Sequence, residues 1–308
     1  MKKNTKLAII LAGLILISIL ISFSGRQEKR QSFDPLMFTV RDTTAVESVV
    51  IAGNATIELK RVEGRWRLND EFEADFNMIE VLKSILSQVK VKRPVAKLNQ
   101  DDIVNDLKQS GRSVTVNYKD GSTYSFVAGG NSSKKDSYYL RDDLAYLVEI
   151  PGYNNYISGI FELTKNQWRD RVLFTTTWRS LQSLNINFTA SKEELEIFFN
   201  QKFLAVKGVD QLDTTSLMNY MEQFQYFQIN DFLEKGKYEK YDSLLQTEHM
   251  AILTIKDIDQ TKNRKLNVYP LIKGESFYLL TDEKEEMMVI DSKRMNNLLS
   301  KKDQFISN

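Results

Sequence analysis

The residues that could do chemistry in this chain are few, and none stands in a complete catalytic pattern. Ser87 and Lys90 have the Ser-x-x-Lys spacing of penicillin-interacting enzymes, but the SDN and KTG segments that complete such a site do not occur. Asp257 and Asp259 resemble the first ligands of a calcium loop, but the sixth position is Lys262 and not glycine. We therefore interpret the first pattern as an exposed helix face and the second as a turn.

Composition removes most metal and thiol chemistry. The chain has no cysteine and a single histidine, His249, which excludes disulfides, thiolate metal sites, cysteine nucleophiles and a two-histidine zinc helix within one chain. A P-loop and a GxGxxG motif are also absent from the sequence. We expect no metal and no cofactor, interpret His249 as a strand-edge residue, and predict that the protein is not an enzyme.

The balance of charge argues against nucleic acid as a partner. Lys and Arg number 42 and Asp and Glu number 41, which leaves a net charge of +1. A domain that binds nucleic acid usually presents a basic face. We therefore expect no nucleic-acid partner.

The first thirty residues are unusual in composition. Three lysines precede an uncharged apolar run from Leu7 to Phe23, which as a helix would extend for ~26 Å, close to the thickness of a bilayer's hydrocarbon core. We expect residues 1–30 to be a signal-anchor, a single transmembrane helix in the cytoplasmic membrane, followed by a linker at 31–45 and a periplasmic body. Cleavage near Ser24 stays open as an alternative.

The body of the chain shows the same order of elements twice. Residues 46–70 and 181–208 each alternate apolar and polar positions over three short segments, which predicts three antiparallel strands. An amphipathic helix is predicted after each set, over residues 76–89 after Asp75 and over residues 214–227 after Asp213. A catalytic pair of these two aspartates is the alternative to two helix N-caps, and equivalent caps in a repeated unit explain both without chemistry.

Two similar hairpins close the two halves. SYYLRDDLAYLVEI, residues 137–150, and SFYLLTDEKEEMMVI, residues 276–290, each predict two strands around a polar turn. We predict an α+β fold of two tandem repeats, each an antiparallel β-sheet packed on one long helix, preceded by the N-terminal transmembrane helix. The predicted divisions of the body are the first repeat, the junction, the second repeat and the tail: 46–159, 160–180, 181–300 and 301–308.

The junction carries the candidate interaction residues. It contains Trp168, Arg169, Asp170 and Arg171, an aromatic residue followed by three charged ones. Charged side chains beside a buried aromatic need partners, because unpaired charges are costly to bury. The segment therefore predicts a latch in which Trp168 is buried and an arginine reaches a carboxylate; binding of a ligand or partner is the alternative.

The WRDR segment, the GRWRLND turn at 64–70 and the repeated layout resemble an exported bacterial family, domain of unknown function 4340, over residues 45–290. The resemblance implies a membrane-anchored, tandem-duplicated protein of the Bacteroidota type. Some members of that family look like accessory parts of ABC-type transport systems, including systems linked to gliding motility. The resemblance implies no catalytic residues.

Two functions follow as expectations. The first is a non-enzymatic, membrane-anchored envelope protein that engages a partner protein, such as a transporter subunit of an ABC-type or gliding-related system. The alternative is an extracytoplasmic binding module for a glycan or a peptide. A glycosidase-like enzyme that uses carboxylates alone is disfavoured, because the repeat explains the paired acids.

Overall fold

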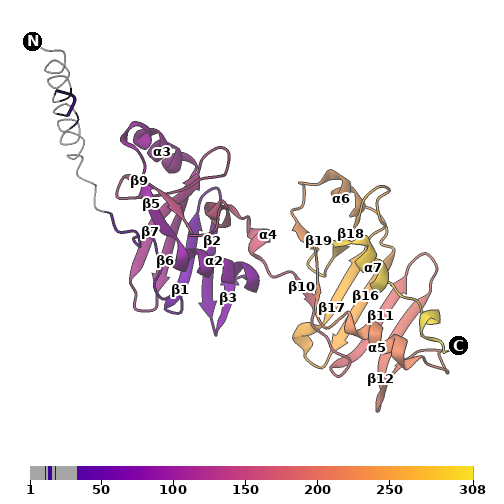
Figure 1. Cartoon of the computed structure of the whole chain (residues 1–308). Coiled ribbons are helices and arrows are strands. Elements are labelled where there is room, and N and C mark those ends of the chain that lie inside the picture. Colours follow the sequence, from indigo (N-terminus) through magenta and orange to yellow (C-terminus); the bar gives the residue numbers. More distant parts are fainter. Residues whose placement is uncertain (1–10, 12, 16–17, 19–32, 308) are drawn as a thin grey trace, which may run out of the picture. The chain divides into compact units, whose positions relative to one another are not determined.

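A computed structural model describes residues 11, 13–15, 18 and 33–307 of the chain (Figure 1). It divides into two compact units. Residues up to Thr56 together with Val81–Glu162 form the first unit, and Ile57–Glu80 together with the residues from Leu163 onward form the second. The boundary passes through helix α2 (Phe76–Gln88).

The first unit is built on six antiparallel strands in the order β1-β6-β7-β8-β9-β5. These strands are β1 (Val46–Ala52), β5 (Lys90–Pro94), β6 (Arg112–Tyr118), β7 (Thr123–Gly130), β8 (Ser137–Arg141) and β9 (Leu144–Glu149). The predicted hairpin at 137–150 is β8 and β9, with Leu140 opposite Ala145. Its two turn residues, Asp142 and Asp143, have φ of 52° and 58°, the left-handed region that a tight two-residue hairpin turn requires.

Aromatic side chains fill the core of the first unit. The Phe38 ring lies edge-on to Tyr139 at 5.2 Å between centroids, and Phe126 stacks on Tyr139 at 4.6 Å. Helix α3 (Lys97–Ser110) covers β7, β8 and β9 (Figure 1) and buries Val104 and Leu107. Such offset and edge-on pairs add to the stability that burial of the rings supplies.

The second unit contains an eight-stranded antiparallel sheet in the order β13-β12-β11-β16-β17-β18-β19-β15. Its strands are β11 (Leu181–Phe188), β12 (Glu194–Asn200), β13 (Phe203–Val206), β15 (Asp231–Leu233), β16 (Ala251–Asp257), β17 (Arg264–Val268), β18 (Phe277–Thr281) and β19 (Met287–Asp291). Helices α5 (Thr214–Glu222) and α7 (Ser292–Leu298) contribute buried residues to its core. Helix α6 (Glu239–Leu244) contributes Tyr241 to a smaller cluster.

Shorter strands complete the second unit. Strands β2 (Thr56–Val62), β3 (Arg65–Leu68) and β4 (Phe72–Glu73) pair in sequence, with Leu59 opposite Leu68. Strand β10 (Val172–Phe174) pairs with β14 (Phe227–Gln228). The connection before β10 consists of a 3₁₀ helix, η1 (Ile157–Glu162), which belongs to the first unit, and the short helix α4 (Lys165–Trp168).

The predicted fold class needs correction. The described part of the chain is mostly antiparallel β-sheet, and no single long helix organises each half. Helix α2 has 13 residues, α3 has 14 and α5 only 9. The apolar stripe after Asp213 predicted a helix as far as Phe227, but Phe227 enters β14 opposite Phe174. Burial against another strand outweighed helical periodicity there.

The predicted localisation also needs correction. In the described residues no helix is long and apolar enough to cross a membrane, so a single-pass membrane protein with a periplasmic body is not supported. The predicted span, Leu7 to Phe23, lies for the most part outside the described residues, as does Ser24.

Candidate functional site

The junction residues and their partners belong to the second unit. Helix α4 begins after Thr164, whose N–H donates to Gln167 Oε1 at 2.9 Å, the reciprocal half of a capping box. The helix ends at Trp168, and the chain then runs in an extended conformation into β10. The short helix therefore places Trp168 and the three charged residues after it directly before strand β10.

Trp168 is fully buried. Its carbonyl accepts from the Asp75 N–H at 2.8 Å, and the Asp170 N–H donates to the Glu73 carbonyl at 2.9 Å. Arg169 forms a β-bridge with Ala74 between these two bonds. Residues 168–170 thus pair with 73–75 as a short antiparallel ladder, which holds the β4 segment against the junction.

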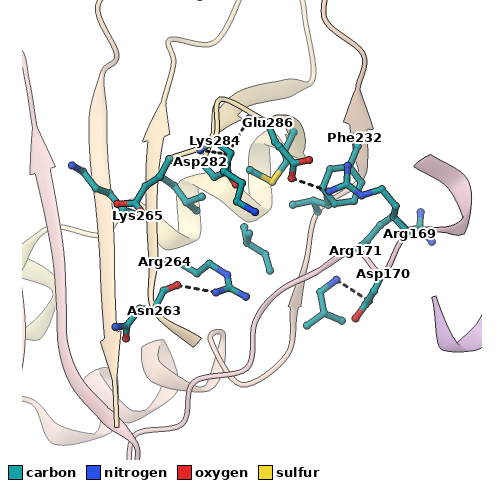
Figure 2. A pocket seen from close by; sticks show the side chains of 16 residues that line it. Arg169, Asp170, Arg171, Phe232, Asn263, Arg264, Lys265, Asp282, Lys284 and Glu286 are labelled. Carbon is teal, nitrogen blue, oxygen red and sulfur yellow. Dashed lines mark hydrogen bonds and ion pairs between the residues drawn. The ribbon is translucent and has the colours of Figure 1, made fainter. Parts of the chain in front are cut away.

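Arg169 lies between two aromatic rings. Its guanidinium carbon is 3.7 Å from the Phe72 ring centroid and 3.6 Å from that of Phe232. Its Nη2 donates to Glu286 Oε2 at 2.8 Å, an ion pair visible beside Phe232 in Figure 2. Only 8% of Arg169 is exposed. A planar guanidinium can stack and form an ion pair at once, so this side chain ties β4, β15 and the β18–β19 turn together.

Arg171 and Asp75 form the second contact of the junction. Arg171 Nη2 lies 3.7 Å from Asp75 Oδ2, and its Nη1 donates to the Asn230 carbonyl at 3.3 Å. Asp75 Oδ1 also accepts from the backbone N–H groups of Asn77 and Met78, at 2.8 and 3.1 Å. The carboxylate therefore caps helix α2 and balances an arginine, which explains why a buried acid is tolerated there.

The predicted roles of the two aspartates as N-caps are confirmed. Asp213 Oδ1 accepts from Thr215 N and Ser216 N at 3.0 and 3.1 Å, so each aspartate caps its own helix. The hydrogen bonds from Ser216 hold the pKa of Asp213 below its usual range. A backbone-capping carboxylate has its lone pairs engaged and needs no catalytic explanation.

Asp170 has an environment that disfavours its charge. Burial raises the pKa of Asp170, and the nearby carboxylates of Asp75 and Glu73 raise it further. A hydrogen bond from the Val172 N–H to Asp170 Oδ1, at 3.0 Å, opposes this effect in part. Burial and like charges both favour the neutral acid.

A cavity of about 390 Å³, called the junction cavity below, opens beside residues 169–173. Figure 2 shows its lining side chains, which come from β10 and the residues before it, from β15 and the residues before it, from β17 and the residue before it, and from the β18–β19 turn and β19. Four buried apolar residues contribute to the lining: Leu173, Ile229, Leu266 and Met288. A second cavity, of about 360 Å³, shares Arg169 and Glu286 with the first. The Arg169–Glu286 pair thus forms a wall common to both.

The other sequence candidates lie outside this cavity. Ser87 Oγ donates to the Ser84 carbonyl at 3.2 Å within helix α2. Asp257 accepts from Ser180 Oγ and from the Asp259 N–H, at 2.8 and 2.9 Å, which confirms a turn. Within the described residues, no group of three or more metal-ligating side chains is present.

Sequence reasoning found the four junction residues but missed their partners. Phe72, Phe232 and Glu286 come from three distant segments, and Glu286 is 117 positions from Arg169. Arg264 and Lys284, which line the cavity, were also missed. The acidic run TDEKEE was interpreted only as a polar turn, and nothing local in it marks Glu286 as the partner of an arginine.

A family model described as domain of unknown function, DUF4340, matches residues 66–248, more than half of the chain. The chain belongs to this family. The match includes the whole junction and Phe232 but ends before Arg264, Lys284 and Glu286. No curated protein and no solved structure matches the chain.

Proposed function

We propose that this family member is a non-enzymatic protein that engages a partner protein through the surface around the junction cavity. The observation that carries the proposal is the cavity itself, whose walls are fixed by the stack on Arg169 and by its ion pair with Glu286. A preorganised concave surface lowers the entropy cost of binding. The resemblance described above supports a partner in an ABC-type transport or gliding-related system.

The chemistry of the lining favours binding over catalysis. The described residues that line the cavity include no serine, threonine, tyrosine or histidine, the usual nucleophiles and bases. Three of its four acids are engaged structurally: Glu286 with Arg169, and Asp170 and Asp282 with backbone N–H groups. Phe232 is its one aromatic ring, and Arg169 covers it, so the cavity offers no open stacking platform for a sugar.

We also propose that the chain arose by tandem duplication. The strand path β1-β6-β7-β8-β9-β5 and the path β11-β16-β17-β18-β19-β15 have the same order along the chain. Each first strand is followed by a hairpin, β2–β3 or β12–β13, and then by a helix capped by an aspartate. Agreement of this many connections supports a common ancestor for the two halves. Tandem duplication would be contradicted if the two halves were superposed and the two capped helices occupied unrelated positions.

The proposal is tested by capture of the partner in cells. A tagged full-length chain would be crosslinked in its native host and purified, and the attached proteins identified by mass spectrometry. We expect the same protein in replicate captures. A bulky residue at the exposed rim of the cavity, Glu283→Trp, should reduce its recovery several-fold, because it blocks the entrance.

The matched control is Lys273→Trp. Lys273 is also exposed, but it does not line the cavity. Its capture yield should equal that of the wild type. Equal yields from both variants, or no reproducible protein from the folded wild-type chain, would contradict the proposal.

A further inference from the structure

We propose that the junction cavity binds acidic side chains of an extended segment of the partner protein, held by Arg264 and Lys284. This inference rests on the proposed function and names the chemistry that the partner presents. The two cations come from different elements: Arg264 begins β17, and Lys284 lies in the turn between β18 and β19. In Figure 2, the guanidinium and the ammonium group are both directed into the cavity.

Arg264 is held in place yet keeps donors available. Its Nη1 donates to the backbone carbonyls of Thr261 and Asn263, both at 2.8 Å. No described residue accepts from its Nε or Nη2. Carbonyls fix the direction of the guanidinium without neutralising its charge. A carboxylate that enters the cavity would therefore meet an oriented fork of donors, the geometry that favours bidentate recognition.

Lys284 is likewise without a carboxylate partner among the described residues. The turn that carries it is fixed by Asp282, whose Oδ1 accepts from the N–H groups of Lys284 and Glu286, both at 2.9 Å. Glu285 in this turn has a φ of 59°, which is uncommon for a residue other than glycine. The turn therefore presents the lysine from a defined position, although its long side chain remains exposed.

The carboxylates that line the cavity do not neutralise this pair. Glu286 is engaged by Arg169, and Asp282 by two backbone N–H groups. Asp170 accepts a hydrogen bond from the Val172 N–H at 3.0 Å. Glu283 is the one lining acid without a hydrogen bond or ion pair among the described residues, and it is exposed at the rim.

The floor of the cavity strengthens any ion pair formed above it. Leu173, Ile229, Leu266 and Met288 are each less than one tenth exposed. Charges that meet against an apolar surface are screened less than charges in bulk water. An extended segment with glutamate or aspartate beside apolar residues would match both features, the cations on the walls and the apolar floor.

The test uses the purified full-length chain and a defined probe. The probe is a rhodamine-labelled peptide of six glutamates with an amidated C-terminus, so that all its carboxylates are side chains. Binding would be followed by fluorescence anisotropy at low ionic strength and again at physiological salt. The peptide with six glutamines serves as the uncharged comparison.

The variant removes both cations, Arg264→Gln with Lys284→Gln. The matched control, Lys256→Gln with Lys273→Gln, removes the same charge from two exposed lysines of the same unit that do not line the cavity. We expect the first variant to bind the glutamate peptide at least tenfold more weakly than the wild type, since charge-assisted hydrogen bonds are lost. The control should stay within twofold, with unchanged melting temperatures in both.

Four results would overturn the inference. The two variants could lose affinity equally, the glutamine peptide could bind as tightly as the glutamate peptide, or the wild type could bind neither. Inorganic phosphate that occupies the cavity more tightly than the peptide would overturn the assignment to a carboxylate. One combination of results separates the two proposals. If the peptide assay shows loss of binding only in the Arg264 and Lys284 variant, but the crosslinking experiment captures no protein in cells, the proposed function is contradicted and the binding of acidic side chains is not.

Discussion

Truncation of Trp168 is the sharpest perturbation of the junction. A buried aromatic side chain removes on the order of 200 Å² from water, which at ~25 cal/mol/Å² gives an upper estimate of about 5 kcal/mol. Trp168 is 0% exposed, and its indole N–H has no acceptor among the described residues, which lowers its net contribution. We expect Trp168→Ala to cost about 3–5 kcal/mol, the usual range for buried aromatics.

The assay is urea unfolding of the full-length chain, followed by circular dichroism. Two units can unfold in two transitions, so hydrogen exchange of peptides from β10 and β14 would assign the loss to the second unit. The control is Trp168→Phe, which keeps an aromatic ring and removes the unpaired N–H. It should cost about 1–2 kcal/mol.

A loss below about 1 kcal/mol for Trp168→Ala would refute the latch, because a buried indole that holds the junction cannot be removed so cheaply. Unchanged stability together with a lost partner would instead make Trp168 a recognition residue. Equal losses in the alanine and phenylalanine variants would show that the ring itself contributes little.

Four further substitutions test other contacts in the two units. Arg169→Lys keeps the charge but loses the stacking between two rings, and should cost about 1–2 kcal/mol in urea unfolding; no change would contradict the stack. The folded-state pKa of Asp170 is raised, so the ionised form of Asp170 destabilises the protein above that pKa. Asp170→Asn should therefore be more stable than the wild type at neutral pH, and this difference in stability should vanish below the ordinary aspartate pKa of 3.8. Tyr220 Oη donates to the Leu298 carbonyl at 2.7 Å, whereas Tyr139 Oη has no partner among the described residues. Thermal melts should therefore show that Tyr220→Phe costs about 1 kcal/mol and that Tyr139→Phe is neutral or stabilising. A larger loss from Tyr139→Phe than from Tyr220→Phe would refute the reasoning.

Local signals in the sequence predicted local structure well. Asp75 and Asp213 cap the helices that follow them, as their positions before the two apolar stripes predicted. The hairpins at 137–150 and 276–290 appear as strand pairs. Turn chemistry and capping depend on a few adjacent residues, so a single sequence contains what is needed to predict them.

Features that depend on distant residues could not be predicted in this way. The stripe through Phe227 was compatible with a longer helix, and its pairing with Phe174 is a tertiary contact. The residues around Arg169 come together only when β4, β15 and the β18–β19 turn are in place. Sequence could indicate that the arginine needs a carboxylate, but it could not identify Glu286.

Site-specific photo-crosslinking tests the central claim, that the chain engages a protein partner at the junction cavity, most directly. A photoreactive phenylalanine would replace Glu283 at the rim or, as the control, Lys273, which is exposed and does not line the cavity. We predict a discrete crosslinked protein from position 283 in living cells and at least fivefold less of it from position 273. Equal yields from the two positions, or no adduct from the folded chain at position 283, would contradict the account.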